Sequence, residues 1–325
     1  MRINENTRVL PWAPTAMAVL GSPAAALLAL LRVALMPLLR DADTGRFATN
    51  VPAVAVALLT LLALLVLSLF CQRERADVPT SRALPASFAG LLAGGMVGAV
   101  AAYDVFRLMF GGILPPPGQV QENNLSKIIL YGLLAFGVLG AVYLVRFGLQ
   151  IASEGGTRRG MSAFGALAPV MWAWCRLAWY EMSYTGTIAW SEKFYDFLMV
   201  IFELLFLFKL ARFTSGVGKT TTGGMLLFSF AAALFSLSGP LTGVGLYFIG
   251  GAEAYSVSHL AGIADAGVGV LALAVGWALV RGMREQPPIE DDSEEYFEEE
   301  DDPYDSSMDS LFVLEENEAS EYNRP

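Results

Sequence analysis

Eight long apolar stretches occupy most of the chain before residue 286. A bilayer core about 30 Å thick is crossed by about 20 helical residues, because each residue adds 1.5 Å along the helix axis. The sequence therefore predicts an all-α fold, a polytopic transmembrane helix bundle of about eight spans. The predicted spans are 15–39, 51–70, 86–110, 126–147, 162–181, 194–213, 224–249 and 257–281.

Composition supports a membrane environment, because 55% of the residues are hydrophobic and only 16% are charged. Charged residues usually make up about a quarter of a soluble protein. The first apolar segment follows Arg2 and Arg8, as a signal peptide would, but it is too long for one and contains Arg32. We therefore expect it to be retained as the first helix, and Pro23 and Pro37 predict that this helix is kinked or lies partly at the membrane interface.

The C-terminal segment differs sharply from the rest of the chain. Residues 287–325 hold 16 Asp and Glu against Arg324, a formal charge of −15, whereas residues 1–286 carry +5. A segment so charged and so poor in apolar residues cannot bury enough surface to fold alone. The sequence thus predicts a transmembrane domain over 1–286 and a disordered acidic tail over 287–325.

A short apolar island interrupts this tail. It is either part of a solubilising tail or a docking segment that folds as a helix in the groove of a cytosolic protein. The island residues are Met308, Leu311, Phe312, Val313 and Leu314.

Basic residues are distributed unequally between the two sides of the predicted bundle. The N-terminus, the tail and the loops after spans two, four and six carry 14 Lys and Arg, whereas the opposite loops carry five. Positively charged loops remain in the cytoplasm. We therefore expect a multi-pass plasma-membrane protein with both termini cytoplasmic.

Six ionisable residues fall inside or near the ends of the predicted spans, where each costs roughly 2.5 to 3.5 kcal/mol unless it is buried and paired. Most are expected in the outer half of the bundle. Two interpretations remain open: ion pairs that hold the helices in register, or a polar cavity that binds a small solute or ion. The residues of this candidate polar cluster are Arg32, Asp104, Arg107, Arg176, Glu203 and Asp265.

Two further features lie at a similar depth. Gly239 and Pro240 predict either a broken helix with exposed backbone groups or a simple proline kink. Trp172, Trp179 and Tyr180 share a helical face with Arg176 and are either a ligand-binding aromatic wall or part of the interfacial belt. Tyr195 is assigned to the same belt, and Asp196 to the solvated outer surface.

Small residues recur on two predicted helices. Gly90, Gly94, Gly98 and Ala102 are spaced every four residues, and Gly262, Gly269 and Gly276 every seven. Small residues allow membrane helices to approach closely, so these positions predict helix contacts rather than a substrate groove.

Several classes of function lack support in the sequence. Cys71, Cys175 and His259 are too few and too dispersed for a disulfide framework or a metal site, and we expect no cofactor. Gly218, Lys219 and Thr220 match the end of a phosphate-binding loop, but that motif needs glycine at position 213, where the chain has Phe213. The serine-hydrolase patterns also fail. An intramembrane enzyme with dispersed catalytic residues stays open as a third and disfavoured class, and we expect no nucleic-acid binding.

The segment from Trp172 to Trp179 around Arg176, with Lys209, Arg212 and Lys219 after span six, resembles uncharacterised multi-pass membrane proteins of Gram-positive anaerobes. The resemblance covers spans five to seven and implies a single plasma membrane but no activity. From the residues, the favoured function is a carrier-like or solute-binding membrane protein. The alternative is a non-catalytic adaptor that recruits a cytosolic protein through its tail.

Overall fold

The structure is a computed structural model of the whole chain, and it is all-helical in the part that it describes. Each described segment consists of one helix with at most a few flanking residues. The predicted acidic tail and its apolar island lie outside the described residues. The described residues are 12–35, 50–71, 84–109, 124–153, 162–183, 190–215, 222–248 and 259–285.

Eight helices occupy these segments, and each corresponds to one of the eight stretches predicted from the sequence. The fourth differs most, because it continues about six residues beyond the predicted span. Hydropathy marks the part of a helix that suits hydrocarbon, and the backbone hydrogen bonds continue past it. The helices are α1 (Ala13–Leu35), α2 (Val51–Leu69), α3 (Leu84–Met109), α4 (Asn124–Ser153), α5 (Ala163–Ser183), α6 (Trp190–Ser215), α7 (Thr222–Phe248) and α8 (His259–Glu285).

Six of the described helices are long and apolar enough to cross a membrane, namely α1, α2, α3, α4, α7 and α8. The chain is therefore a multi-pass membrane protein by the composition of its helices. The expected eight spans are met only in part, because α5 and α6 fall short. Arg176 and three tryptophans lower the hydropathy of α5, and α6 carries Glu203 together with Lys209 and Arg212.

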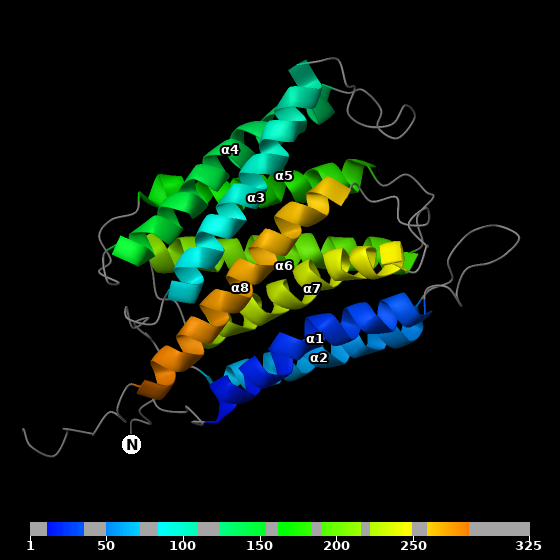
Figure 1. Cartoon of the computed structure of the whole chain (residues 1–325), viewed down its shortest axis with the longest axis vertical. Helices are drawn as coiled ribbons and strands as arrows, with labels where there is room; N and C mark the ends of the chain where they lie inside the picture. Colours follow the sequence, from blue (N-terminus) through cyan, green and yellow to red (C-terminus); the bar gives the residue numbers. More distant parts are fainter. Residues whose placement is uncertain are drawn as a thin grey trace, which may run out of the picture. The chain divides into compact units, whose positions relative to one another are not determined.

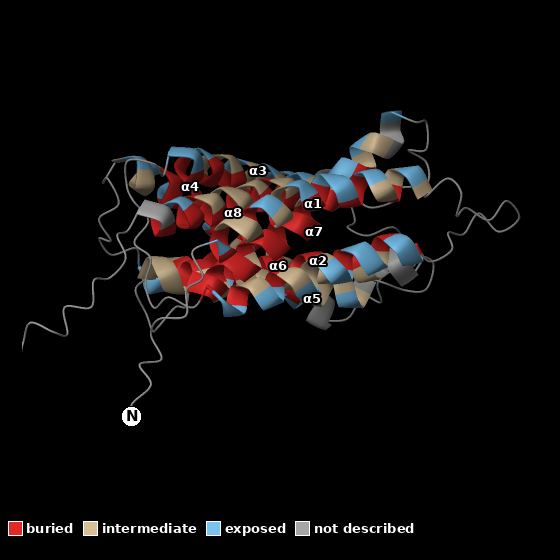
Figure 2. Ribbon diagram, turned by 90° about the horizontal axis from the view of Figure 1, so that it is seen from below, coloured by how far each residue is buried: buried red, intermediate tan, exposed pale blue. Residues whose placement is uncertain are grey.

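Helices α7 and α8 form the centre of the bundle (Figure 1). Helix α7 packs against α1, α2, α6 and α8, and α8 also packs against α3. On the far side of α3 lie α4 and then α5, which returns to α6. Buried residues concentrate on these inner helices, while exposed positions follow the outward faces (Figure 2). Exposed leucines such as Leu59 and Leu62 on α2 suit a surface in contact with lipid.

The structure confirms the predicted contacts at Gly90, Gly94, Gly98, Gly269 and Gly276, whereas Ala102 is exposed. A methyl group at Gly94 of α3 would lie 2.7 to 2.9 Å from atoms of Val145 and Ala141 on α4. A methyl group at Gly269 of α8 would lie 2.9 Å from Leu237 on α7. These glycines allow backbones to approach closely, and this packing partly replaces the hydrophobic effect as a source of helix association in lipid.

Side-chain contacts between neighbouring helices define one end of the bundle. There Cys71 Sγ, just after α2, lies 3.8 Å from Met17 Sδ near the start of α1. Ser87 Oγ at the start of α3 donates a hydrogen bond to the carbonyl of Gly148 late in α4, at 2.6 Å. Tyr143 of α4 is hydrogen-bonded to Thr214 at the end of α6. We call this the Cys71 end, and the charged residues described next lie toward the opposite end.

Candidate functional site

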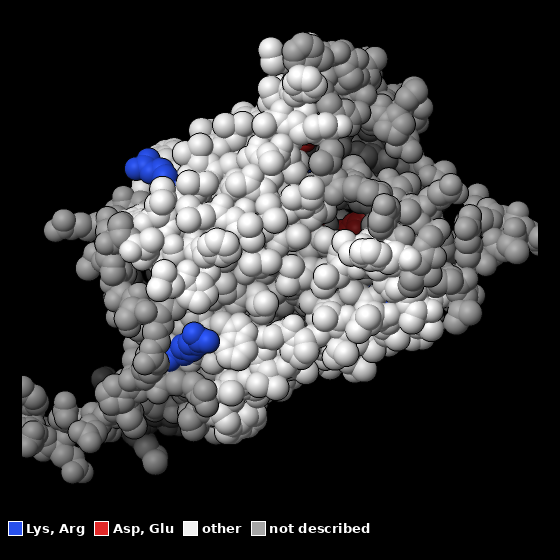
Figure 3. Space-filling model, in the orientation of Figure 1, with Lys and Arg blue, Asp and Glu red and all other residues white. Residues whose placement is uncertain are grey.

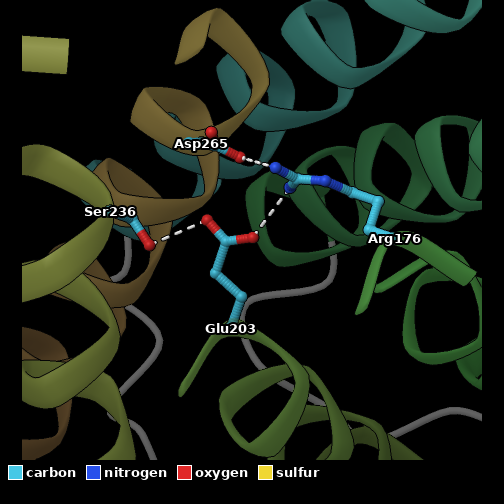
Figure 4. Close-up of polar contacts among 4 residues, drawn as sticks. All are labelled: Arg176, Glu203, Ser236 and Asp265. Carbon is cyan, nitrogen blue, oxygen red and sulfur yellow. Dashed lines mark hydrogen bonds and ion pairs between the residues drawn. The ribbon is translucent and has the colours of Figure 1, made fainter. Parts of the chain in front are cut away.

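One guanidinium group contacts two carboxylates from different helices in the core of the bundle. Arg176 of α5 donates from Nη1 to Oε2 of Glu203 on α6 at 2.9 Å, and its Nη2 forms an ion pair with Asp265 of α8. Figure 4 shows the guanidinium between the two acids. The exposed fractions are 6% for Arg176, 0% for Glu203 and 3% for Asp265. These three residues are the charged triad, and they unite three members of the cluster predicted from the sequence.

A fourth helix completes the hydrogen bonding of Glu203. Ser236 of α7, which is fully buried, donates from its hydroxyl to Oε1 of Glu203 at 2.8 Å. Both carboxylate oxygens of Glu203 therefore have a donor, one from Ser236 and one from Arg176. Burial of a charge in a low-dielectric core requires such partners, and this carboxylate has them.

Aromatic rings lie beside the guanidinium of the triad. The Arg176 guanidinium carbon is 4.8 Å from the ring centroid of Trp172 and 5.9 Å from that of Tyr180. Cation–π attraction adds to the ion pairs at such distances. Trp172 is buried, whereas Trp179 and Tyr180 are half-buried. The predicted aromatic wall thus includes two rings, Trp172 and Tyr180, that contact the protein's own arginine.

Arg32 of α1 is 1% exposed, and its guanidinium carbon lies 4.4 Å from the ring centroid of Tyr195 on α6. The next residue of α6, Asp196, is 7% exposed. Tyr180, which lies beside the Arg176 guanidinium, is close enough to both Asp196 and Asp265 to be influenced by their charges. A buried polar region therefore extends from the triad toward α1.

The structure corrects two expectations for this region. Tyr195 was expected in the interfacial belt and Asp196 on the solvated surface, but both are buried. The sequence did hold a signal for Asp196, since Asp196 and Glu203 are seven residues apart and so lie on one face of a helix. The role of Ser236 as the donor to Glu203 depends on packing between α6 and α7.

Asp104 and Arg107 do not join the triad through any contact that the structure describes. Asp104 is half-buried on α3, and the side chain of Arg107 lies outside the described residues. Of the two readings of Gly239 and Pro240, the structure shows proline within a continuous helix, because α7 runs unbroken from Thr222 to Phe248. Ser238 and Thr242 donate their hydroxyls to carbonyls of the same helix.

The formal charges of the region do not balance. Arg176 faces two acids, so the charged triad carries −1 when all three groups are ionised. Counting all the charged residues buried in the described part of the chain gives the same result, with Arg32 and Arg176 against Asp196, Glu203 and Asp265. Among the described residues, no group of three or more His, Cys, Asp or Glu is placed to hold a metal ion.

We compared the chain with protein-family models, with curated proteins and with solved structures, and none of them matches it.

Proposed function

We propose that this multi-pass membrane protein binds a small solute or ion at the charged triad, in the manner of a carrier. The observation that carries the proposal is the contact of one buried guanidinium with two carboxylates from separate helices. Two helices can be held in register by one ion pair, which would also leave no net charge in the core. Desolvation of the second carboxylate costs several kcal/mol. The triad contains no second basic residue to compensate this charge.

The surrounding helices support this proposal. The triad residues Arg176 and Glu203 lie on α5 and α6, the two described helices that fall short of the apolar composition of a membrane span. Polar composition in the middle of such a bundle is costly and is common where a substrate or ion passes. Helix α7 brings Ser236 to the triad and carries Pro240 one turn further along. Proline removes one backbone hydrogen bond, which leaves a carbonyl near the triad without its helical donor.

We also propose that all eight helices cross the plasma membrane and that both termini are cytoplasmic. At 1.5 Å per residue, the 21 residues of α5 and the 26 of α6 extend roughly 32 and 39 Å, enough to cross a bilayer core. The excess of basic residues in the loops at the Cys71 end favours its location in the cytoplasm. The triad then lies toward the outer side.

The test is ligand-dependent stabilisation of the purified full-length protein in detergent. A ligand that binds only the folded state raises the melting temperature. We expect at least one class of solute to raise the melting temperature of the wild type. The classes to be tested are small carboxylates, amino acids, sugars and nucleosides. Glu203→Gln and Asp265→Asn should fold and lose the response, because each removes one carboxylate and leaves Arg176 paired with the other.

Arg176→Ala distinguishes binding from a purely structural role. It leaves two carboxylates without their counter-charge. If no water reaches them, the free energy of unfolding should fall by about 3 to 5 kcal/mol, which is enough to prevent assembly. In a hydrated site, water screens the stranded acids, so the variant should fold and lose the solute response. Arg146→Ala, which removes an exposed arginine on α4, is the matched control and should keep the response.

The rival proposal is an adaptor whose triad only fixes the helices and whose tail recruits a cytosolic protein. The direct contacts within the triad favour a structural role for it. Under this proposal the segment containing Leu311 and Phe312 captures a specific partner, and Leu311→Asp with Phe312→Asp abolishes capture. If all three triad variants unfold and no solute stabilises the wild type, the carrier proposal gives way to this one.

A further inference from the structure

We infer that Asp265 holds a bound monovalent cation, either a proton or an alkali metal ion, while its other oxygen is paired with Arg176. This inference rests on the proposed function and deepens it, because it names a class of ion that the charged triad takes. A bound positive charge removes the formal charge of −1 from the core. The bound cation then travels with, or is exchanged for, the solute that the carrier moves.

The charge count gives the first reason. Two carboxylates share one guanidinium, and the excess of one negative charge remains when Arg32 and Asp196 are included. An uncompensated buried charge is strongly destabilising. A single positive charge is therefore the stoichiometric complement of the described core. A divalent ion would overcompensate, and the described residues offer it no cluster of three acidic, histidine or cysteine ligands.

The hydrogen bonds indicate which carboxylate binds the cation. Both oxygens of Glu203 already accept hydrogen bonds, from Ser236 and from Arg176, and the residue is fully buried. Asp265 contacts Arg176 through Oδ1 only, and its carboxylate has no second contact comparable to the Ser236 hydroxyl on Glu203 among the described residues. Figure 4 shows that the second oxygen of Asp265 points away from the guanidinium. Asp265 has an exposed fraction of 3%, and a carboxylate oxygen that is not used by Arg176 can carry a proton or coordinate a cation.

Few acidic atoms are visible on the face shown in Figure 3. In Figure 3 acidic atoms are seen only at the bottom of hollows in the described face, whereas basic side chains project near the opposite end. A recessed negative charge with low-dielectric walls concentrates its field in the opening and raises the local concentration of cations.

Several other titratable or charged groups lie toward the same end and would influence the bound charge. Among the described side chains, α1, α3 and α6, which pack on α8, each contribute at least one such group, and α5 contributes through the triad. They are Arg32 on α1, Tyr103 and Asp104 on α3, Arg176 and Tyr180 on α5, and Asp196 and Glu203 on α6.

The experiment measures the melting temperature of the full-length protein in detergent. Sodium, potassium or lithium chloride replaces N-methylglucamine chloride at fixed pH and constant ionic strength. A second series varies the pH from mildly acidic to mildly alkaline in N-methylglucamine chloride alone. For a bound alkali ion, we expect the melting temperature to rise by about 2 °C for each tenfold increase in the ion above its dissociation constant. For a bound proton, the alkali salts have no effect, and the melting temperature is higher at acidic pH.

Variants test whether the response depends on the excess charge of the triad. Asp265→Asn removes the excess charge and should abolish the ion or pH response relative to the wild type. Glu203→Gln also balances the charge and should abolish it, so the inference stays testable if one of the two variants does not fold. Glu181→Gln, at an exposed acid near the end of α5, is the matched control and should keep the full response.

Each outcome decides between the cation site and the carrier function. A response that persists in both Asp265→Asn and Glu203→Gln, or no response to any alkali ion or to pH in the wild type, overturns the cation site. If the cation site is overturned but solutes still stabilise the wild type, the proposed carrier function stands without a cation site. A cation response without any solute response supports the site and contradicts the proposed solute binding.

Discussion

At the scale of single residues, the buried hydroxyl of Ser236 shows how the core tolerates a carboxylate. It donates to Glu203 from a neighbouring helix, and this bond satisfies the oxygen that Arg176 does not reach. Ser238, two residues further along α7, is equally buried but donates to the carbonyl of Phe235 in its own helix. The two serines therefore differ in function although they share a helix and a degree of burial.

Ser236→Ala should lower stability more than Ser238→Ala. The first substitution removes a hydrogen bond to a charged group and leaves a buried oxygen of Glu203 without a donor, which costs about 2 kcal/mol. The second removes a neutral bond within one helix, and the carbonyl keeps its helical partner, so we expect a loss below about 1 kcal/mol. Denaturation of both variants in detergent measures the difference. Equal losses would show that the Ser236 bond to Glu203 contributes nothing specific.

At the scale of helices, the contact between α3 and α4 depends on glycines rather than on interlocking large side chains. Gly90 and Gly94 lie against Gly148 and Val145, with space for no methyl group at ordinary contact distance. On the same helix Gly95 is exposed, and a methyl group there would meet nothing within 4 Å. The two neighbouring glycines thus separate the effect of helix contact from the effect of removing a glycine.

Gly94→Ala should destabilise the protein by about 1 to 3 kcal/mol, because its methyl group would overlap the backbone of Val145 and Ala141 and force α3 and α4 apart. Gly95→Ala should be neutral or slightly stabilising, because alanine favours the helix and meets no neighbour. Melting temperatures of both variants test the prediction. A Gly94→Ala variant as stable as Gly95→Ala would contradict the close approach of these helices.

At the scale of the whole molecule, the proposed orientation is open to thiol labelling, but the native cysteine nearest to an end is poorly suited to it. Cys71 is fully buried, and its burial raises the pKa of the thiol to about 11. Little of the reactive thiolate forms at neutral pH. Labelling therefore needs new cysteines in a chain that carries Cys71→Ser and Cys175→Ser.

Ala152→Cys and Glu181→Cys form a suitable pair, because both positions are exposed and they lie near the C-terminal ends of the antiparallel neighbours α4 and α5. With both termini in the cytoplasm, a membrane-impermeant maleimide should label Glu181→Cys in intact cells. Ala152→Cys should react only after the cells are opened. The reverse pattern would invert the proposed orientation, and labelling of both positions in intact cells would show that α5 does not cross the membrane.

The sequence by itself determined the helices and part of the charged triad. Apolar runs of about 20 residues specify where the chain can cross hydrocarbon, so all eight helices were predicted to within a few residues at most ends. The cost of charge in that environment identified Arg176, Glu203 and Asp265 as residues that need partners. Glycine spacing likewise predicted which faces of α3 and α8 pack closely.

Only the tertiary structure decided which groups pair. Arg176 could have paired with Asp104 or Asp196 on charge alone, and the packing of α5, α6 and α8 brings Glu203 and Asp265 to it instead. The same packing buries Tyr195 and Asp196 and places the Ser236 hydroxyl on Glu203. Hydropathy depends on each residue and its neighbours in the chain, whereas these contacts depend on the rotation of each helix against residues far away in sequence.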